Sequence, residues 1–307
     1  MAALYVVATP IGNLNDLTPR MREALENCDL IAAEDTRVTM KLLQVMDIHK
    51  PMVSCHRHNE DGKKDGIIEK MLAEDLTVAL TCDAGTPGIS DPGEVLVDAA
   101  WEAGIPVIPV SGPSAVVTAL SVSGFDTVNF AFFGFLPREN KDLDRKLTEI
   151  HDSGIPVAVL YESPHRVLDL LKRIALVLPG SRVTVCCDLT KKFEKLDRGE
   201  ITAVVETLSK RENLEKGEYC IVLDMHDVPK KEPPAANTEL TAEQALFQKL
   251  MSGADLRDAC DELKQQGFKR NDIYRARLAF SNIYPPGNAT RADDSLPYGQ
   301  RYALSLP

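Results

Sequence analysis

The chain has 307 residues, of which 44% are hydrophobic and 26% charged, enough to bury a sizeable core in two domains. Its formal net charge of −11 argues against broad, sequence-independent binding of nucleic acid, although a local basic groove stays compatible with it. Seven cysteines without C-x-x-C spacing favour reduced thiols, and the longest apolar runs have only strand length, so we expect a cytoplasmic protein without a signal peptide or membrane span.

Strands alternate with helices in the first part of the chain. Apolar runs predict strands over residues 4–8, 30–33, 52–55, 76–80 and 106–110. Helical spacing predicts a helix with Pro19 at its first position and others over 39–46, 66–73, 94–103 and 114–122, the last closing this half. The alternation predicts βαβ units and a mainly parallel sheet.

Three turns rich in glycine and proline follow predicted strands, at residues 9–13, 83–93 and 111–115. Because parallel strands end at one edge of a sheet, we expect these turns to form a single pocket there. The sequence has neither G-x-G-x-x-G at the first helix nor G-x-x-x-x-G-K-[ST], which excludes a nicotinamide-type fingerprint and a P-loop. The pocket is therefore expected to hold its ligand through other backbone contacts.

A second, smaller α/β or α+β half follows. Strands are predicted over 130–137, 157–161, 182–187 and 216–223, and helices within 138–146 and over 167–178 and 202–209. Helices are also predicted over 241–251, 255–265 and 273–279. The expected organisation is an N-terminal α/β domain (1–120), a C-terminal α/β domain (121–228), a linker (229–238), a helical tail (239–283) and an irregular or disordered end (284–307).

The helical tail carries a local concentration of basic residues, Lys269, Arg270, Arg275 and Arg277. A solvated helical cap and an RNA-contact module both explain such a group.

The turns and their flanks resemble those of the tetrapyrrole-methylase superfamily, the class III S-adenosylmethionine-dependent methyltransferases. The resemblance is carried by A-T-P-I-G-N-L at 8–14, I-A-A-E-D-T-R at 31–37, D-A-G-T-P at 83–87, I-S-D-P-G at 89–93, G-P-S-A at 112–115, G-F-L-P at 134–137, E-S-P-H-R at 162–166, L-T-K at 189–191 and K-G-E at 216–218. These motifs run in the family's order. Cys82, Ser111 and Asp188 depart from the serine, proline and glutamate usual there.

The resemblance implies two α/β domains with S-adenosylmethionine in the cleft between them, and a homodimer. The helical tail predicted above adds a small C-terminal helical segment to this fold. By match of motif, the cofactor would contact Pro10, Gly12, Asp83, Ala84, Gly85, Thr86, Ile89, Ser90, Ser111, Gly112, Ser114 and Ala115, with Leu160 and Tyr161 closing the site from the second domain. Backbone N–H groups of a glycine turn are suited to holding the carboxylate of its methionine part.

Within the superfamily, the resemblance implies methylation of the 2'-hydroxyl of a cytidine in 16S rRNA of the small ribosomal subunit. A ribose hydroxyl is a poor nucleophile, so a nearby base or cation would assist. We assign the base or hydroxyl-orienting role to Glu34 or Asp35, and place Arg37 on phosphates. Substrate contacts are predicted for His58, Asn59, Glu60, Glu162, His165, Arg166 and Lys191.

No metal is expected at Cys55, His56 and His58, because residues that alternate along a strand end point to opposite faces.

Two other functions stay open at this point. A tetrapyrrole methylase would need a largely apolar cleft for its acceptor, whereas a non-catalytic RNA-binding assembly protein need not bind the methyl donor. The charged segments 34–37 and 56–60 favour a polar acceptor, and the intact glycine and proline turns favour a bound donor.

Overall fold

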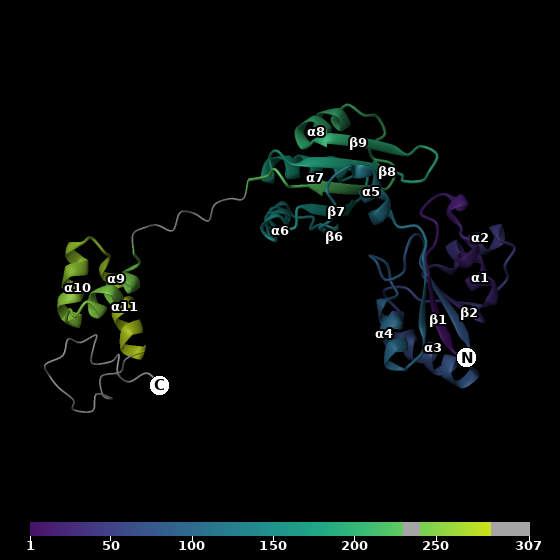
Figure 1. The fold of residues 1–307 in the computed structure, drawn as a ribbon, viewed down its shortest axis with the longest axis horizontal. Helices are drawn as coiled ribbons and strands as arrows, with labels where there is room; N and C mark the ends of the chain where they lie inside the picture. The colour runs from purple at the N-terminus through teal and green to yellow at the C-terminus, as the bar shows by residue number, and fades with distance from the viewer. Residues whose placement is uncertain (230–239, 284–307) are drawn as a thin grey trace. The chain divides into compact units, whose positions relative to one another are not determined.

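The computed structural model describes residues 1–229 and 240–283, and the chain divides into two compact units, 1–230 and 231–307 (Figure 1). The predicted irregular end and all but the first residue of the predicted linker lie outside the described residues.

The first sheet has five parallel strands in the order β3-β2-β4-β1-β5, which confirms the predicted parallel sheet. Its strands are β1 Ala3–Val7, β2 Leu30–Ala33, β3 Met52–Ser54, β4 Thr77–Thr81 and β5 Val107–Val110. The helices between them are α1 Pro19–Asn27, α2 Thr36–Val45, α3 Glu60–Glu74 and α4 Glu94–Glu102, with a short 3-10 turn, η1 Leu14–Asp16, before α1.

Both faces of this sheet are covered, which is why its strands are apolar runs without polar alternation. Met21 and Leu25 of α1 pack with Val7 on one face, and α2 covers the same side. Met71 of α3 packs with Leu4 on the other face, together with α4. The helices cover the two faces, and the turns lie at the carboxyl edge of the sheet.

The second sheet has the order β6-β7-β10-β8-β9, and within it only β6 and β7 are parallel. Its strands are β6 Phe130–Phe135, β7 Val157–Glu162, β8 Arg182–Cys187, β9 Lys195–Glu200 and β10 Tyr219–Asp224. Strand β9 is absent from the sequence prediction. It is a charged strand, K-L-D-R-G-E, that pairs with β8 alone, so it carries no run of apolar residues to reveal it.

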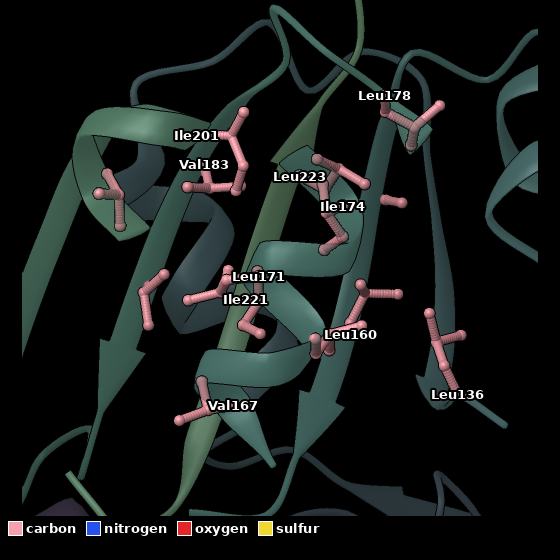
Figure 2. Packing of buried hydrophobic residues seen from close by; sticks show 14 of the residues in the cluster. Leu136, Leu160, Val167, Leu171, Ile174, Leu178, Val183, Ile201, Ile221 and Leu223 are labelled. Atoms are coloured by element: carbon pink, nitrogen blue, oxygen red, sulfur yellow. The ribbon is translucent and has the colours of Figure 1, made fainter. Parts of the chain in front are cut away.

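Helices α6 Asn140–Asp152, α7 Val167–Val177 and α8 Ile201–Ser209 contribute to the core on one face of this sheet. Figure 2 shows Val167, Leu171 and Ile174 of α7 among the side chains of β7, β8 and β10. The opposite face packs against α5 Ala115–Ser123, through Val116 and its buried neighbours. The helix predicted to close the first half thus packs on the second sheet; it is apolar on most sides, so its sequence does not reveal which sheet it covers.

The second unit contains three described helices, α9 Ala242–Met251, α10 Leu256–Gln265 and α11 Arg270–Ile283. Thr241 and Gln244 form a capping box at the start of α9, and Leu246, Leu263 and Ile273 bring the three helices together in one small core. Across residues 1–229 and 240–283, none of the helices combines the length and apolarity that a bilayer crossing requires.

Candidate active site

The three turns meet at the carboxyl edge of the first sheet, as predicted. Thr9 N donates to Gly85 O at 2.7 Å, and Gly85 N donates to Thr9 O at 3.1 Å. The Thr9 hydroxyl donates to Cys82 O at 3.1 Å. At the third turn, an added Cβ on Gly112 would be 2.4 Å from Met21 Cε and 3.0 Å from the Cβ of Ala8, the residue after β1. A larger residue there would force these neighbours to shift.

These turns line a cavity of about 350 Å³, a size usual for small-molecule sites. The first half supplies Ile11, Ala84, Gly85, Thr86, Ile89, Ser90, Asp91, Ser114 and Ala115. The second half supplies Phe135, Tyr161, Glu162, Ser163, Pro164, Leu189, Gly217, Glu218, Tyr219 and Cys220.

Most of the residues predicted to bind the cofactor gather at this cavity. Its lining includes Ala84, Gly85, Thr86, Ile89, Ser90, Ser114, Ala115 and Tyr161. Within the described part of the chain, the lining does not include Pro10, Gly12, Asp83, Ser111, Gly112 or Leu160. Leu160 is fully buried in the core beneath α7, because neighbouring residues of a strand face opposite sides.

Other lining residues received no role in the sequence analysis. Asp91, Phe135 and Glu218 are the chemically distinctive ones. Asp91 belongs to the motif I-S-D-P-G, Phe135 to G-F-L-P and Glu218 to K-G-E. These motifs were the only sign in the sequence that the three residues lie at the site.

Lys191, a predicted substrate residue, connects the first turn with the second half. Its side chain passes Gly12, where φ is +146° and an added Cβ would be 2.5 Å from Lys191 Cγ. Lys191 Nζ lies 3.0 Å from both Asp188 Oδ1 and Glu218 Oε2. Although desolvation works against its charged form, these two carboxylates raise the pKa of Lys191. The lysine is therefore already paired within the protein.

Carboxylates cluster at the ends of β2 and β4. Asp83 N donates to Glu34 Oε2 at 3.2 Å, and Asp35 N donates to Asp83 Oδ1 at 3.2 Å. Burial raises the pKa of Asp91 to about 6, and the negative charges of Glu34 and Asp83 add to this. Burial also raises the pKa values of Glu34 and Asp83.

The pKa of Asp35 shifts in the opposite direction, because its carboxylate is paired with Arg37. Its Oδ1 caps α2 by accepting from Arg37 N at 2.8 Å, and its Oδ2 accepts from Arg37 Nη2 at 2.6 Å. Hydrogen bonds from Arg37 lower the pKa of Asp35 to about 2. Such a carboxylate stays ionised but accepts a proton poorly.

Two predicted substrate residues, Glu60 and Asn59, accept hydrogen bonds from the backbone. Glu60 is 2% exposed, and its Oε1 accepts from Gly93 N at 2.7 Å and Val95 N at 3.2 Å, fixing the start of α4. Asn59 Oδ1 accepts from His56 N at 2.8 Å.

The remaining predicted substrate residues are His58, His165, Glu162 and Arg166. His58 and His165 are exposed. Glu162 is buried at the cavity, where its Oε1 accepts from Ser163 N at 2.7 Å and its Oε2 lies 3.3 Å from Arg166 Nη2. The described residues include no group of three or more potential metal ligands.

The cavity is apolar with an acidic component. Among described residues, its lining has the carboxylates of Asp91, Glu162 and Glu218 and no lysine or arginine, beside apolar groups such as Ile11 and Leu189. Glu162 is paired with Arg166 and Glu218 with Lys191, so the lining favours a small, largely apolar ligand that places a positive group near Asp91.

Known proteins similar to this chain were identified by sequence. The family model of Tetrapyrrole (Corrin/Porphyrin) Methylases matches residues 3–205. A protein of Halalkalibacterium halodurans named ribosomal RNA small subunit methyltransferase I is 45% identical over 221 residues, covering 72% of this chain and 75% of that protein. A protein of the same name from Escherichia coli O157:H7 is 38% identical over 280 residues, covering 90% and 94%.

The fold is also similar to that of a solved structure, the methyltransferase CobJ. The TM-score is 0.55 over 76% of this chain and 98% of CobJ, at 14% sequence identity. The expected fold class, two α/β halves followed by a helical segment, is thereby confirmed.

Proposed function

Because the chain belongs to the tetrapyrrole methylase family, we propose that it transfers a methyl group from S-adenosylmethionine to the 2'-hydroxyl of a cytidine in 16S rRNA. The proposal is supported by a single cavity that motifs of the family line from both halves of the chain. The relatives reported above are named for the small-subunit ribosomal RNA. The enzyme acts in the cytoplasm as a homodimer.

The cavity fits the methyl donor by size and by charge. S-adenosylmethionine has a positive sulfonium and ammonium, one carboxylate and an apolar adenine. Asp91 complements the positive groups, since Glu162 and Glu218 are already paired with Arg166 and Lys191. Ile11 and Leu189 offer apolar contact. The turn at Gly85, where φ is +90°, brings backbone close to the ligand.

When bound, the donor supplies a methyl group activated by its sulfonium. The residues of the chain then have to hold this group in line with the acceptor oxygen. In well-oriented reactions such alignment removes roughly 7–11 kcal/mol of the barrier. The paired turns and the buried carboxylate of Glu60 make the first-half wall rigid. Arg37 is exposed although it is paired with Asp35, and its guanidinium can also donate to a phosphate of the substrate.

The test uses purified protein, labelled S-adenosylmethionine and small ribosomal subunits from a strain that lacks this modification. We expect label on one cytidine of 16S rRNA, resistant to alkaline cleavage at that nucleotide because the 2'-oxygen is blocked. Label on a base, or on an added porphyrin instead of RNA, would contradict the proposal. Sedimentation velocity tests the homodimer.

A further inference from the structure

We propose that the loop between β8 and β9, residues 188–194, forms a docking surface for single-stranded RNA together with Lys195 at the start of β9. On this surface Phe193 stacks on a nucleobase near the acceptor nucleotide, and Lys192 and Lys195 contact phosphates. The inference rests on the proposed function, because it names the part of the chain that holds the ribosomal substrate at the cavity.

The loop starts at the cavity. Leu189, its second residue, belongs to the cavity lining. Lys191 then passes Gly12 of the first turn and pairs with Glu218, another residue of the lining. Phe193 follows four residues after Leu189, a separation of at most about 14 Å between Cα atoms. RNA that binds to the loop at Phe193 is therefore close to the cavity.

The loop is held in one conformation. Asp188 and Thr190 have φ of +52° and +68°, left-handed values that are uncommon for residues with side chains. Lys191 N donates to Asp188 O at 3.0 Å, and Glu194 N donates to Lys191 O at 3.1 Å. Thr190 N donates to Glu194 Oε2 at 2.5 Å, so this carboxylate closes the turn. A preorganised loop loses little conformational freedom when a ligand binds.

The solvent-facing side of the loop is aromatic and basic. Phe193 is 72% exposed, and Lys192 Nζ lies 5.5 Å from the centroid of its ring. Lys192 and Lys195 are exposed, and in the part of the chain that the structure describes neither of them forms an ion pair. Asp197 of β9, by contrast, is paired with Arg211 at 2.6 Å. Two lysines are therefore available to a ligand beside an available ring.

This combination fits a single strand of RNA better than a protein partner. Proteins hold single strands by stacking bases on aromatic rings and by placing cations along the backbone. One exposed phenylalanine alone would need no explanation, but here lysines flank the ring on a loop fixed at the cavity. Because the chain has a formal net charge of −11, phosphates are attracted only where cations gather locally. Subunit contacts, in contrast, are depleted of lysine.

The first experiment measures methylation of unmethylated small subunits. Phe193→Ala should raise KM for subunits about tenfold or more with little change in kcat, and should leave the Kd for S-adenosylmethionine within about threefold and the Tm unchanged. Phe193→Trp should restore the wild-type KM, since tryptophan also stacks on bases. Trp101→Ala, at an exposed ring of α4, is the matched control and should behave as wild type.

The second experiment tests the phosphate contacts through their salt dependence. In Lys192→Gln combined with Lys195→Gln, we expect KM at low salt to rise and the slope of log KM against log salt concentration to fall by about 1.4, because two contacts to a single strand are lost. Lys70→Gln combined with Lys172→Gln changes the net charge equally, at exposed lysines of α3 and α7, and should leave the slope as in the wild type.

A third measurement does not depend on turnover. Trp101 is the single tryptophan of the chain, so Trp101→Phe combined with Phe193→Trp moves the only indole to the loop. Titration with small subunits in the presence of S-adenosylhomocysteine should quench the fluorescence of this variant, as stacking on a base does. The wild type, whose indole lies on α4, should show no quenching beyond the absorbance of the added subunits.

The outcomes separate the inference from the proposed function. If the wild type methylates subunits but Phe193→Ala and the lysine pair keep its KM and its salt dependence, the loop does not dock RNA and the proposed function stands. An indole at position 193 that is not quenched has the same meaning. Dissociation of a dimer in either loop variant, by sedimentation velocity, would identify a subunit contact and overturn the inference. If the wild type transfers no label to subunits, although it binds S-adenosylmethionine, the proposed function itself fails.

Discussion

Asp35 and Asp91 have the same side chain but different neighbours. The guanidinium of Arg37 satisfies Asp35 and lowers its pKa to about 2, whereas Asp91 is partly desolvated and close to two other carboxylates, which raises its pKa to about 6. The sequence places both residues in turns at strand ends, but only the folded surroundings distinguish an ionised helix cap from a carboxylate with a raised pKa. The catalytic role of Glu34, Asp35 and Arg37 stays a prediction, in which the low pKa of Asp35 favours hydroxyl orientation over proton acceptance for that residue.

Asp35→Ala tests the capping role. The change removes the oxygen that accepts from Arg37 N at the start of α2, so we expect the free energy of unfolding, and with it the urea midpoint, to fall. Asp35→Asn should recover most of it, since asparagine also caps helices. Urea denaturation near pH 7 measures both. Because the folded pKa is lowered, the electrostatic part of the stabilisation is present above the unfolded value and is lost as the pH falls towards about 2. Equal losses in both variants would argue against the cap.

Phe135→Ala tests the aromatic residue at the cavity. The ring is 60% exposed although it lines the site, and its centroid is 5.8 Å from that of Tyr161. An exposed ring stabilises the fold little but is available for stacking on a nucleobase, worth about 1–3 kcal/mol. We expect KM for small subunits to rise about tenfold or more, with the Kd for S-adenosylmethionine and the Tm unchanged. An equal loss of donor affinity would place the ring on the donor instead.

At the scale of secondary-structure elements, the first turn and the second half are connected through Gly12 and Lys191. A side chain at position 12 would require an unfavourable φ and would push Lys191 away from Asp188 and Glu218. We therefore expect Gly12→Ala to cost about 1–3 kcal/mol in unfolding free energy and to weaken binding of S-adenosylmethionine.

Gly66→Ala is the matched control for this change. Gly66 lies inside α3 with open space around its Cα, so alanine there should be neutral or stabilise by up to about 1 kcal/mol. Calorimetry and chemical denaturation of the two variants measure the contrast. If Gly12→Ala behaved like Gly66→Ala, the contact with Lys191 would have no energetic importance.

The elements differ in how far the sequence determines them. The parallel strands and the three turns are predictable, because apolar runs and Gly-Pro motifs are local signals. Strand β9 is not, since its charged residues owe their extended conformation to pairing with β8. The second-half wall of the cavity, including Phe135 and Glu218, depends on how α5 and the turns pack against the second sheet, and no local pattern encodes that packing.

At the scale of the whole molecule, every residue that lines the cavity lies in the first compact unit. The second unit has its own small core, formed by Leu246, Leu263 and Ile273 with their neighbours. The second unit is therefore not needed to complete the cavity lining.

Truncation after residue 229 tests this separation. The shortened chain retains both sheets and the complete cavity lining, so we expect cooperative unfolding and a Kd for S-adenosylmethionine within about threefold of the full chain by calorimetry. If the basic residues of the tail, such as Lys269 and Arg270, contact RNA, KM for small subunits should rise and become less dependent on salt in the shortened chain. An unchanged KM would leave the tail as a solvated cap. A truncated chain that unfolds cooperatively yet fails to bind the donor would show that the cavity is incomplete without residues 231–307.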